Sequence, residues 1–148
     1  MKKLLASMAV AAVLAPASAF AEDVPFTATV ASTCGIVVNT AGTLGPNGDA
    51  SVLSSANGTA AAATVTANAL NFTLSVGAPS GWVTSPTGTP TTSFDAAMTF
   101  GGTTYSTSDT PSVPATATPV SVDMSATAAS GSFPNGSYST NATLTCSS

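Results

Sequence analysis

The 148-residue sequence predicts an all-β protein, an immunoglobulin-like antiparallel β-sandwich of about seven strands. Apolar and polar residues alternate with a period of two along several short stretches, as they do in half-buried strands. Loops rich in Gly, Pro, Asn and Ser separate these stretches. No stretch places apolar residues at helical spacing behind a capping residue, which argues against helices.

The predicted strands follow one another along the whole chain. The first covers residues 24–34 and continues, after Gly35, through residues 36–38. Gly101-Gly102 predicts a tight hairpin, because the turns that match strand twist need positive φ. The other predicted strands cover residues 60–67, 70–76, 94–100, 103–105, 120–126 and 138–146.

Residues 1–21 have the pattern of a secretory signal peptide. Lys2 and Lys3 form a basic start, residues 4–14 form a short apolar segment, and Ala19-Phe20-Ala21 fits a cleavage site. We therefore expect an exported protein whose mature chain, residues 22–148, is a single domain. No later segment contains the ~20 consecutive apolar residues that a membrane-spanning helix needs.

The charge pattern excludes several classes of function. Lys2 and Lys3 are the only basic residues, whereas all six acidic residues follow residue 21. A mature chain without Lys, Arg or His lacks the cations that bind nucleic acid or an anionic membrane surface. It also lacks the commonest catalytic bases, and its scattered acids predict no metal site. We expect neither an enzyme nor a bound cofactor.

The two cysteines, Cys34 and Cys146, both fall at the apolar parity of a predicted strand. In an exported protein this favours a structural disulfide, which would enclose nearly the whole domain in one loop. The alternative is a pair of unpaired or intermolecular thiols.

The predicted loop at residues 77–90 carries the only tryptophan, Trp82. An aromatic residue among Gly, Pro and Ser is compatible with two roles. The ring could cover one end of the sandwich core, or it could contact a ligand as a platform on which a sugar stacks.

The segment at the start of the mature chain has an apolar face made of Val24, Phe26, Ala28 and Val30. A strand with such a face must lie in an apolar groove. The sequence does not decide between two grooves, that of the chain's own sheet and that of an identical neighbour.

These features resemble the subunits of archaic chaperone–usher pili, which are related to the spore coat protein U domain. In that family an alternating strand runs into a cysteine just after the signal peptide, as VPFTATVASTC at residues 24–34 does here. A mid-chain strand resembles AAATVTANALNFTLSV at residues 61–76. The family also ends with a Gly-x-Tyr turn into a Thr-rich strand, which residues 136–145 resemble.

The resemblance implies an incomplete sandwich, completed beside its last strand by the N-terminal donor strand of a neighbouring subunit. Residues 24–30 would be this donor strand. The implied partners are identical or related pilus subunits, a periplasmic chaperone and an outer-membrane usher, and the implied location is the periplasm in transit and then the cell surface. The family's first cysteine usually pairs at the position that Ala67 occupies here. A bond from Cys34 to Cys146 would instead staple one end of the groove or close it.

Two hypotheses of function follow from the sequence. The first is a structural subunit of a surface pilus or fibre, assembled by N-terminal donor-strand exchange. The alternative is a self-contained exported β-sandwich module that binds a glycan or a protein through the Trp82 loop. A fibre subunit should form heat-labile, SDS-resistant ladders, whereas a module should run as one band.

Overall fold

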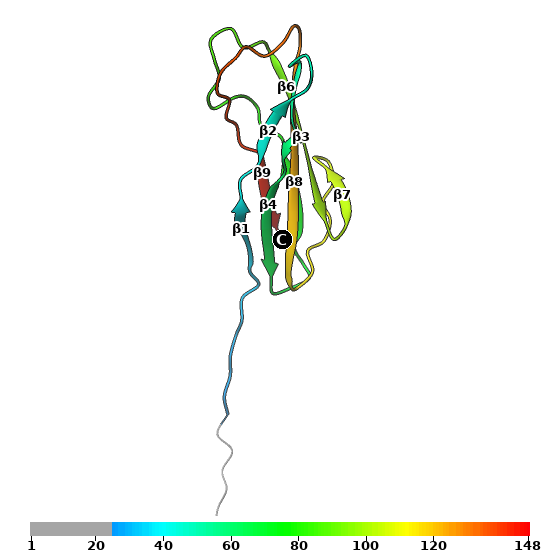
Figure 1. Ribbon diagram of the computed structural model, residues 1–148. Coiled ribbons are helices and arrows are strands. Elements are labelled where there is room, and N and C mark those ends of the chain that lie inside the picture. The colour runs from blue at the N-terminus through cyan, green and yellow to red at the C-terminus, as the bar shows by residue number, and fades with distance from the viewer. Residues whose placement is uncertain (1–24) are drawn as a thin grey trace, which may run out of the picture. The chain divides into compact units, whose positions relative to one another are not determined.

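The computed structural model describes residues 25–148, and every regular element in that range is a β-strand (Figure 1). The predicted signal peptide, residues 1–21, and Val24 lie outside the described residues. Residues 31–148 form one compact unit, and residues 25–30 belong to a separate one. The all-β prediction is confirmed for the described part of the chain.

Nine strands make up the compact unit, and all of their pairings are antiparallel. In chain order they are β1 (Cys34–Thr40), β2 (Thr43–Pro46), β3 (Val52–Thr59), β4 (Ala61–Ala67), β5 (Thr73–Gly77), β6 (Thr92–Phe100), β7 (Thr103–Ser106), β8 (Ala117–Ala128) and β9 (Thr143–Ser147).

The larger sheet contains seven of these strands and is built around β8. β6 pairs with residues 120–128 of β8 along one edge. On the other edge β4 and β3 lie end to end, opposite residues 117–122 and 125–127 of β8. β1 pairs with β4, and β2 pairs with β3. β1 and β2 therefore also lie end to end, and together they form one border of the sheet. β7 pairs with β6 and forms the opposite border.

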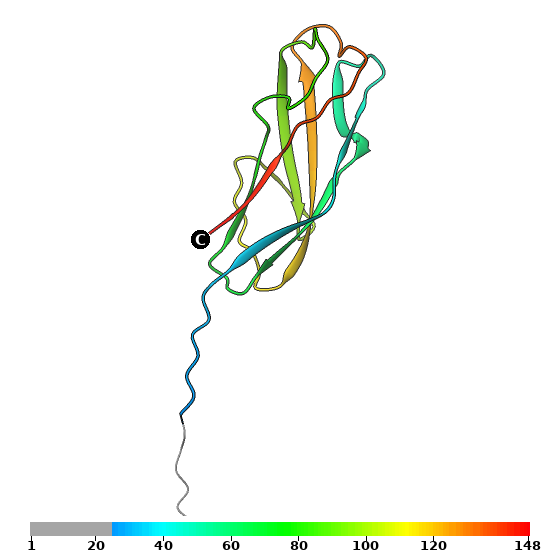
Figure 2. The ribbon, with the colours of Figure 1, turned by 90° about the vertical axis from the view of Figure 1, so that its left-hand side faces the viewer.

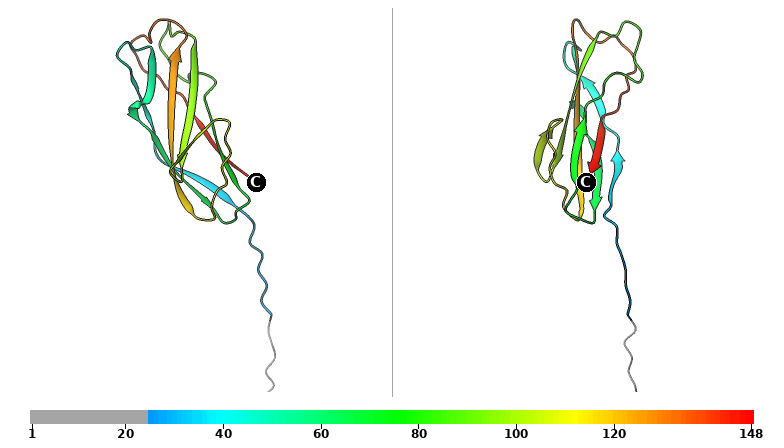
Figure 3. Two further views of the ribbon diagram at one scale, coloured as in Figure 1. Left: turned by 90° about the vertical axis from the view of Figure 1, so that its right-hand side faces the viewer. Right: turned by 180° about the vertical axis from the view of Figure 1, so that it is seen from behind.

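The smaller sheet contains only β5 and β9, and it lies against one face of the larger sheet (Figures 2 and 3). An isolated bridge between Thr84 and Ser139 links the segments that follow β5 and precede β9. The two sheets form a β-sandwich whose layers differ greatly in width.

The main core lies between the two sheets. Alternate residues of β6 and β8 face it, as the period of two in the sequence predicts. A second, smaller cluster contains Leu53, Ala126 and Phe133. The buried residues of the main core are Val65, Ala67, Phe72, Leu74, Val76, Ala96, Met98, Phe100, Val113, Val120 and Val122.

The hairpin predicted at Gly101-Gly102 connects β6 to β7. Both glycines have positive φ, 59° at Gly101 and 81° at Gly102. A side chain would disfavour this left-handed backbone, so the glycine pair is the local cause of the turn.

Two strands were missed by the sequence analysis, and this is why there are nine rather than about seven. Residues 43–46, which lie between two predicted strands, form β2. β3 was not predicted, because one of its two buried positions holds Ser55. The Ser55 hydroxyl donates a hydrogen bond to Asp123 Oδ1 (2.8 Å) and accepts one from the Met124 N–H (3.1 Å). Asp123 is accordingly half-buried.

The first predicted strand begins later than expected. Residues 25–33 belong to no strand of the described chain, and β1 begins at Cys34. In the separate unit, Phe26 is 94% exposed, Val30 is 81% exposed, and Ala28 is also exposed. A strand needs a neighbour to satisfy its backbone hydrogen bonds, so the alternating pattern alone does not make one.

Candidate functional site: the groove between β1 and β9

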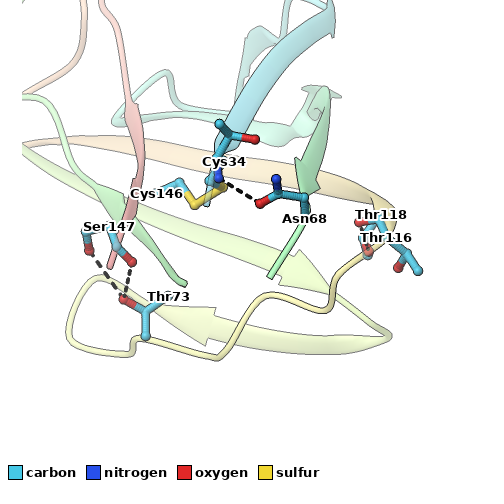
Figure 4. Close-up of a disulfide and its surroundings, with 8 residues drawn as sticks. Cys34, Asn68, Thr73, Thr116, Thr118, Cys146 and Ser147 are labelled. Carbon is cyan, nitrogen blue, oxygen red and sulfur yellow. Dashed lines mark hydrogen bonds between the residues drawn. A yellow bond between two sulfur atoms is a disulfide. The ribbon is translucent and has the colours of Figure 1, made fainter. Parts of the chain in front are cut away.

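The disulfide that the sequence predicted is present. Cys34 and Cys146 are bonded, with their Cα atoms 6.3 Å apart (Figure 4). The bond joins the first residue of β1 to the last strand, and so ties a border of the larger sheet to the smaller sheet. Across the β1–β4 ladder Cys34 faces Ala67.

Beyond the disulfide lies a groove of about 950 Å³. Ile36 lies two residues after Cys34 in β1, and Leu144 lies two residues before Cys146 in β9. Both line the groove. Residues of β1 and β2 line one wall, residues 133–144 line the other, and residues of β3, β4 and β8 line the floor. The disulfide thus staples one end of the groove without filling it. Its larger apolar lining residues are Ile36, Val38, Leu44, Leu53, Trp82, Val122, Met124, Phe133, Tyr138 and Leu144.

Both walls include strand edges without a partner in the described part of the chain. There, β1 pairs with β4 alone and β9 pairs with β5 alone. Each strand therefore has a second edge whose backbone N–H and C=O groups can pair with a further strand. β1 and β9 run in opposite directions (Figure 3), so a strand between them would be antiparallel to one of the two.

Residues of both hydrophobic clusters line the groove. Ile36 and Leu144 pack against the main core, whereas Leu53 and Phe133 belong to the smaller cluster, and all four line the groove. Val38 lines it as well and is 69% exposed. Removing apolar surface from water contributes about 25 cal/mol per Å². An apolar strand in the groove would bury these side chains and join the two clusters into one core.

Aromatic rings cluster at the end of the groove away from the disulfide. The Trp82 ring centroid lies 4.9 Å from Phe94, 5.9 Å from Phe133 and 5.0 Å from Tyr138. The indole N–H donates to Thr92 Oγ1 at 3.1 Å, so the polar atom of the ring is satisfied inside the protein. Edge-to-face contacts of this kind stabilise a packed cluster rather than a flat platform. The environment of Trp82 agrees with a cover over the core, and ligand contact by this residue stays a prediction.

Backbone contacts hold the wall formed by residues 133–144. Ser139 exchanges hydrogen bonds with Thr84, and the Val83 N–H also donates to the Ser139 carbonyl at 2.8 Å. The Thr140 hydroxyl donates to the Gly81 carbonyl at 2.8 Å. The Tyr138 hydroxyl donates to the Pro134 carbonyl at 2.7 Å, which fixes the turn at the start of the wall. The wall is therefore preformed.

None of the described residues that line the groove is charged. Residues 25–148 contain no Lys, Arg or His, and within that range no three His, Cys, Asp or Glu gather into a group that could hold a metal ion. Ligands that depend on charge have no complementary group in this lining. The lining instead suits an extended, uncharged, apolar segment.

Two carboxylates with lowered pKa values lie in turns and do not line the groove. Hydrogen bonds from the Ser51 hydroxyl and amide lower the pKa of Asp49. Hydrogen bonds from the hydroxyl and amide of Ser106 likewise lower the pKa of Asp109. Both carboxylates therefore hold the backbone of their own turns, and neither contributes to the groove.

The sequence identified the disulfide beside the groove and Trp82 in its lining, but not the floor. Leu44 and Leu53 were missed together with β2 and β3. The pair Val52-Leu53 between turn-rich segments was the available signal, but Ser54, Ser55 and Asn57 obscured it.

A scan against protein-family models and searches of curated proteins and of solved structures gave no match to this chain. Among residues 25–148 there is no helix of the length and hydropathy needed to cross a membrane.

Proposed function

We propose that the protein is a structural subunit of a bacterial surface fibre of the archaic chaperone–usher type, and not an enzyme. In this proposal residues 24–30 of one copy enter the groove of another copy as an added strand. A periplasmic chaperone and an outer-membrane usher would handle the exported subunit before it reaches the cell surface.

The observation that carries the proposal is the uncharged groove, flanked by edges of β1 and β9 that have no partner among residues 25–148. A two-stranded sheet such as β5–β9 is marginal alone, and a third strand beside β9 would widen it. The same strand would cover apolar side chains on both walls. Strand addition therefore satisfies the backbone and buries apolar surface in one step.

The N-terminal segment has the length and pattern that this site needs. Seven residues at ~3.3 Å each extend ~23 Å, and β1 along the groove also has seven residues. Alternate residues of the segment are apolar, and exposed Phe26 is the largest of them. Ala61 and Ala63 in the groove floor have small side chains that leave depth for such a ring.

The test is assembly by wild type and by Phe26→Asp. Wild-type protein, incubated with its chaperone and usher, should form SDS-resistant ladders that collapse on heating. Burial of Phe26 should contribute on the order of 1.5–3 kcal/mol to each junction. A carboxylate in the groove would cost several kcal/mol, so Phe26→Asp should form no ladders.

Thr27→Asp is the matched control, because it places the same charge on the opposite face of the same segment. This variant should form ladders as wild type does. The proposal fails if wild type remains a single monomeric band at high concentration and long incubation. It fails equally if Phe26→Asp and Thr27→Asp assemble to the same extent. A single band that binds a glycan or protein would support the self-contained module.

A further inference from the structure

Asn68, directly after β4, holds the three residues that precede β1. Its side-chain Oδ1 accepts a hydrogen bond from the Thr33 N–H (2.7 Å), and its Nδ2 donates to the Ala31 carbonyl (2.8 Å). Its backbone N–H donates to the Thr33 carbonyl at 3.2 Å. Figure 4 shows Asn68 beside Cys34 at the start of β1. One residue thus makes three hydrogen bonds to residues 31–33.

These bonds bear on whether a chain can fill its own groove. β1 begins at Cys34, and its inward residues Ile36 and Val38 line the groove. A segment that precedes Cys34 must therefore reverse direction before it can run along the same groove. Residues 31–33 would have to form the loop of a hairpin, and the Cys34–Cys146 disulfide lies at that end of the groove.

The sequence of residues 31–33 is also unsuited to a hairpin loop. Three-residue hairpin loops commonly require one residue with left-handed φ, which Gly or Asn supplies. The chain has Ala-Ser-Thr there, and Thr33 is β-branched and disfavoured at positive φ. Among residues 25–148, the non-glycine residue with positive φ is Ala50 and none of these three.

We propose that Asn68 is a positioning residue that makes the groove select a second copy of this chain over the chain's own N-terminal segment. With residues 31–33 held, a reversal must use residue 30 or earlier ones. That would consume Val30 and Ala28 in the turn and leave only Val24 and Phe26 to fill the groove. This inference rests on the proposed function and adds the reason why strand addition takes place between molecules.

The test compares monomers of wild type and Asn68→Ala, refolded at low concentration. The probe is a fluorescent peptide of residues 22–30, added in trans. If Asn68→Ala lets about nine-tenths of the chains fill their own groove, peptide binding should weaken about tenfold. The variant should also lose its ladders, and its monomer should melt at a higher temperature than the wild-type monomer. A residue with a merely structural role would lower that melting temperature.

Deleting residues 22–30 from Asn68→Ala provides the decisive readout. The deletion removes the competing segment, so it should restore peptide binding to the level of the wild-type chain with the same deletion. Asn39→Ala is the matched control. The Asn39 side chain also bonds across the β1–β4 pair, to Thr64 Oγ1 at 2.8 Å, but within the described chain it does not bond to residues 31–33. Asn39→Ala should behave as wild type.

Ser32→Gly tests the same inference without altering Asn68, and it applies if Asn68→Ala does not fold. A glycine in the loop eases the reversal, so this variant should also shift from ladders toward a peptide-resistant monomer. The inference is overturned if Ser32→Gly assembles and binds peptide as wild type does, or if the deletion fails to restore binding to Asn68→Ala. Absence of ladders and of peptide binding in wild type would count against the proposed function itself.

Discussion

Asp49 and Asp109 each accept hydrogen bonds from the hydroxyl and the backbone amide of one nearby serine. The partners are Ser51 for Asp49 and Ser106 for Asp109. Both carboxylates are exposed, and these bonds lower the pKa of each. The bonds favour the ionised form, so the folded chain binds a proton at these positions less readily than the unfolded chain does.

A lowered folded-state pKa predicts the sign of the pH dependence. The stability that these bonds contribute is fully present above the unfolded pKa of about 3.9 and is lost as the pH falls through the folded pKa. The free energy of unfolding, measured in urea between pH 5 and pH 2, should fall less steeply for Asp49→Asn/Asp109→Asn than for wild type. Ser51→Ala/Ser106→Ala keeps both acids but removes the hydroxyl donors, and should also flatten the curve. If the free energy of unfolding fell with pH at the same slope in all three proteins, the hydrogen bonds to Asp49 and Asp109 would not be the cause of the pH dependence.

The burial of Ser55 could not be predicted from its residue type or from its neighbours in the sequence. A serine is usually solvent-exposed, and nothing adjacent to it in the sequence indicates burial. Its partners, Asp123 and the Met124 amide, come from β8, 68 and 69 positions away in the sequence. Only the folded sheet brings the Ser55 hydroxyl together with its acceptor, Asp123, and its donor, the Met124 amide, so alternation could not identify β3. Cys34 and Cys146 were predictable because a disulfide needs only two residue types, inward parity and an oxidising compartment.

At the scale of elements, the groove wall depends on close contact between β2 and β3. A Cβ atom added at Gly45 would overlap the Asn57 backbone carbonyl, and one added at Gly58 would overlap the Thr43 carbonyl. β2 and β3 change register between Thr43 and Gly45, which is where these contacts occur. The two glycines therefore allow β2 to lie against the irregular part of β3.

Gly45→Ala should consequently destabilise the domain and disturb the wall that contains Leu44. Forcing a methyl group into a packed contact typically costs about 1–3 kcal/mol. The loss should appear in the free energy of unfolding, together with weaker binding of the peptide of residues 22–30. Gly48→Ala is the control, because a Cβ atom there meets nothing within 4 Å. Equal stability of the two variants would show that the β2–β3 contact relaxes freely.

The strands that alternation predicted best are those that face one continuous core. β6 and β8 keep their period of two because each buried position is apolar. β5 begins at Thr73, later than predicted, because Leu70 lies in a loop and is 74% exposed. The N-terminal segment has an equally regular pattern, but residues 25–33 form no strand in this chain. Alternation predicts that a segment can be a strand, and its partner must be found from the fold.

At the scale of the whole molecule, one covalent bond closes a loop across nearly all of residues 31–148. Cys34 and Cys146 are 112 positions apart, and chain entropy for a loop of this size gives about 4.7 kcal/mol as an upper figure. A domain is typically stable by only 5–15 kcal/mol. The bond also ties β9, which otherwise pairs only with β5 in the described residues, to the opposite wall of the groove.

Cys34→Ala/Cys146→Ala should therefore lower the free energy of unfolding by about 2–5 kcal/mol, measured in urea at neutral pH. Because β9 would lose its tie to β1, the variant should also bind the peptide of residues 22–30 more weakly than wild type. Wild type in a thiol reductant should reproduce both losses, whereas the reductant should change neither property of the double variant. A double variant that unfolds at the urea concentration of wild type would mean that the sandwich holds β9 against β5 without the bond. In that case packing alone would hold the two walls together at the Cys34–Cys146 end of the groove.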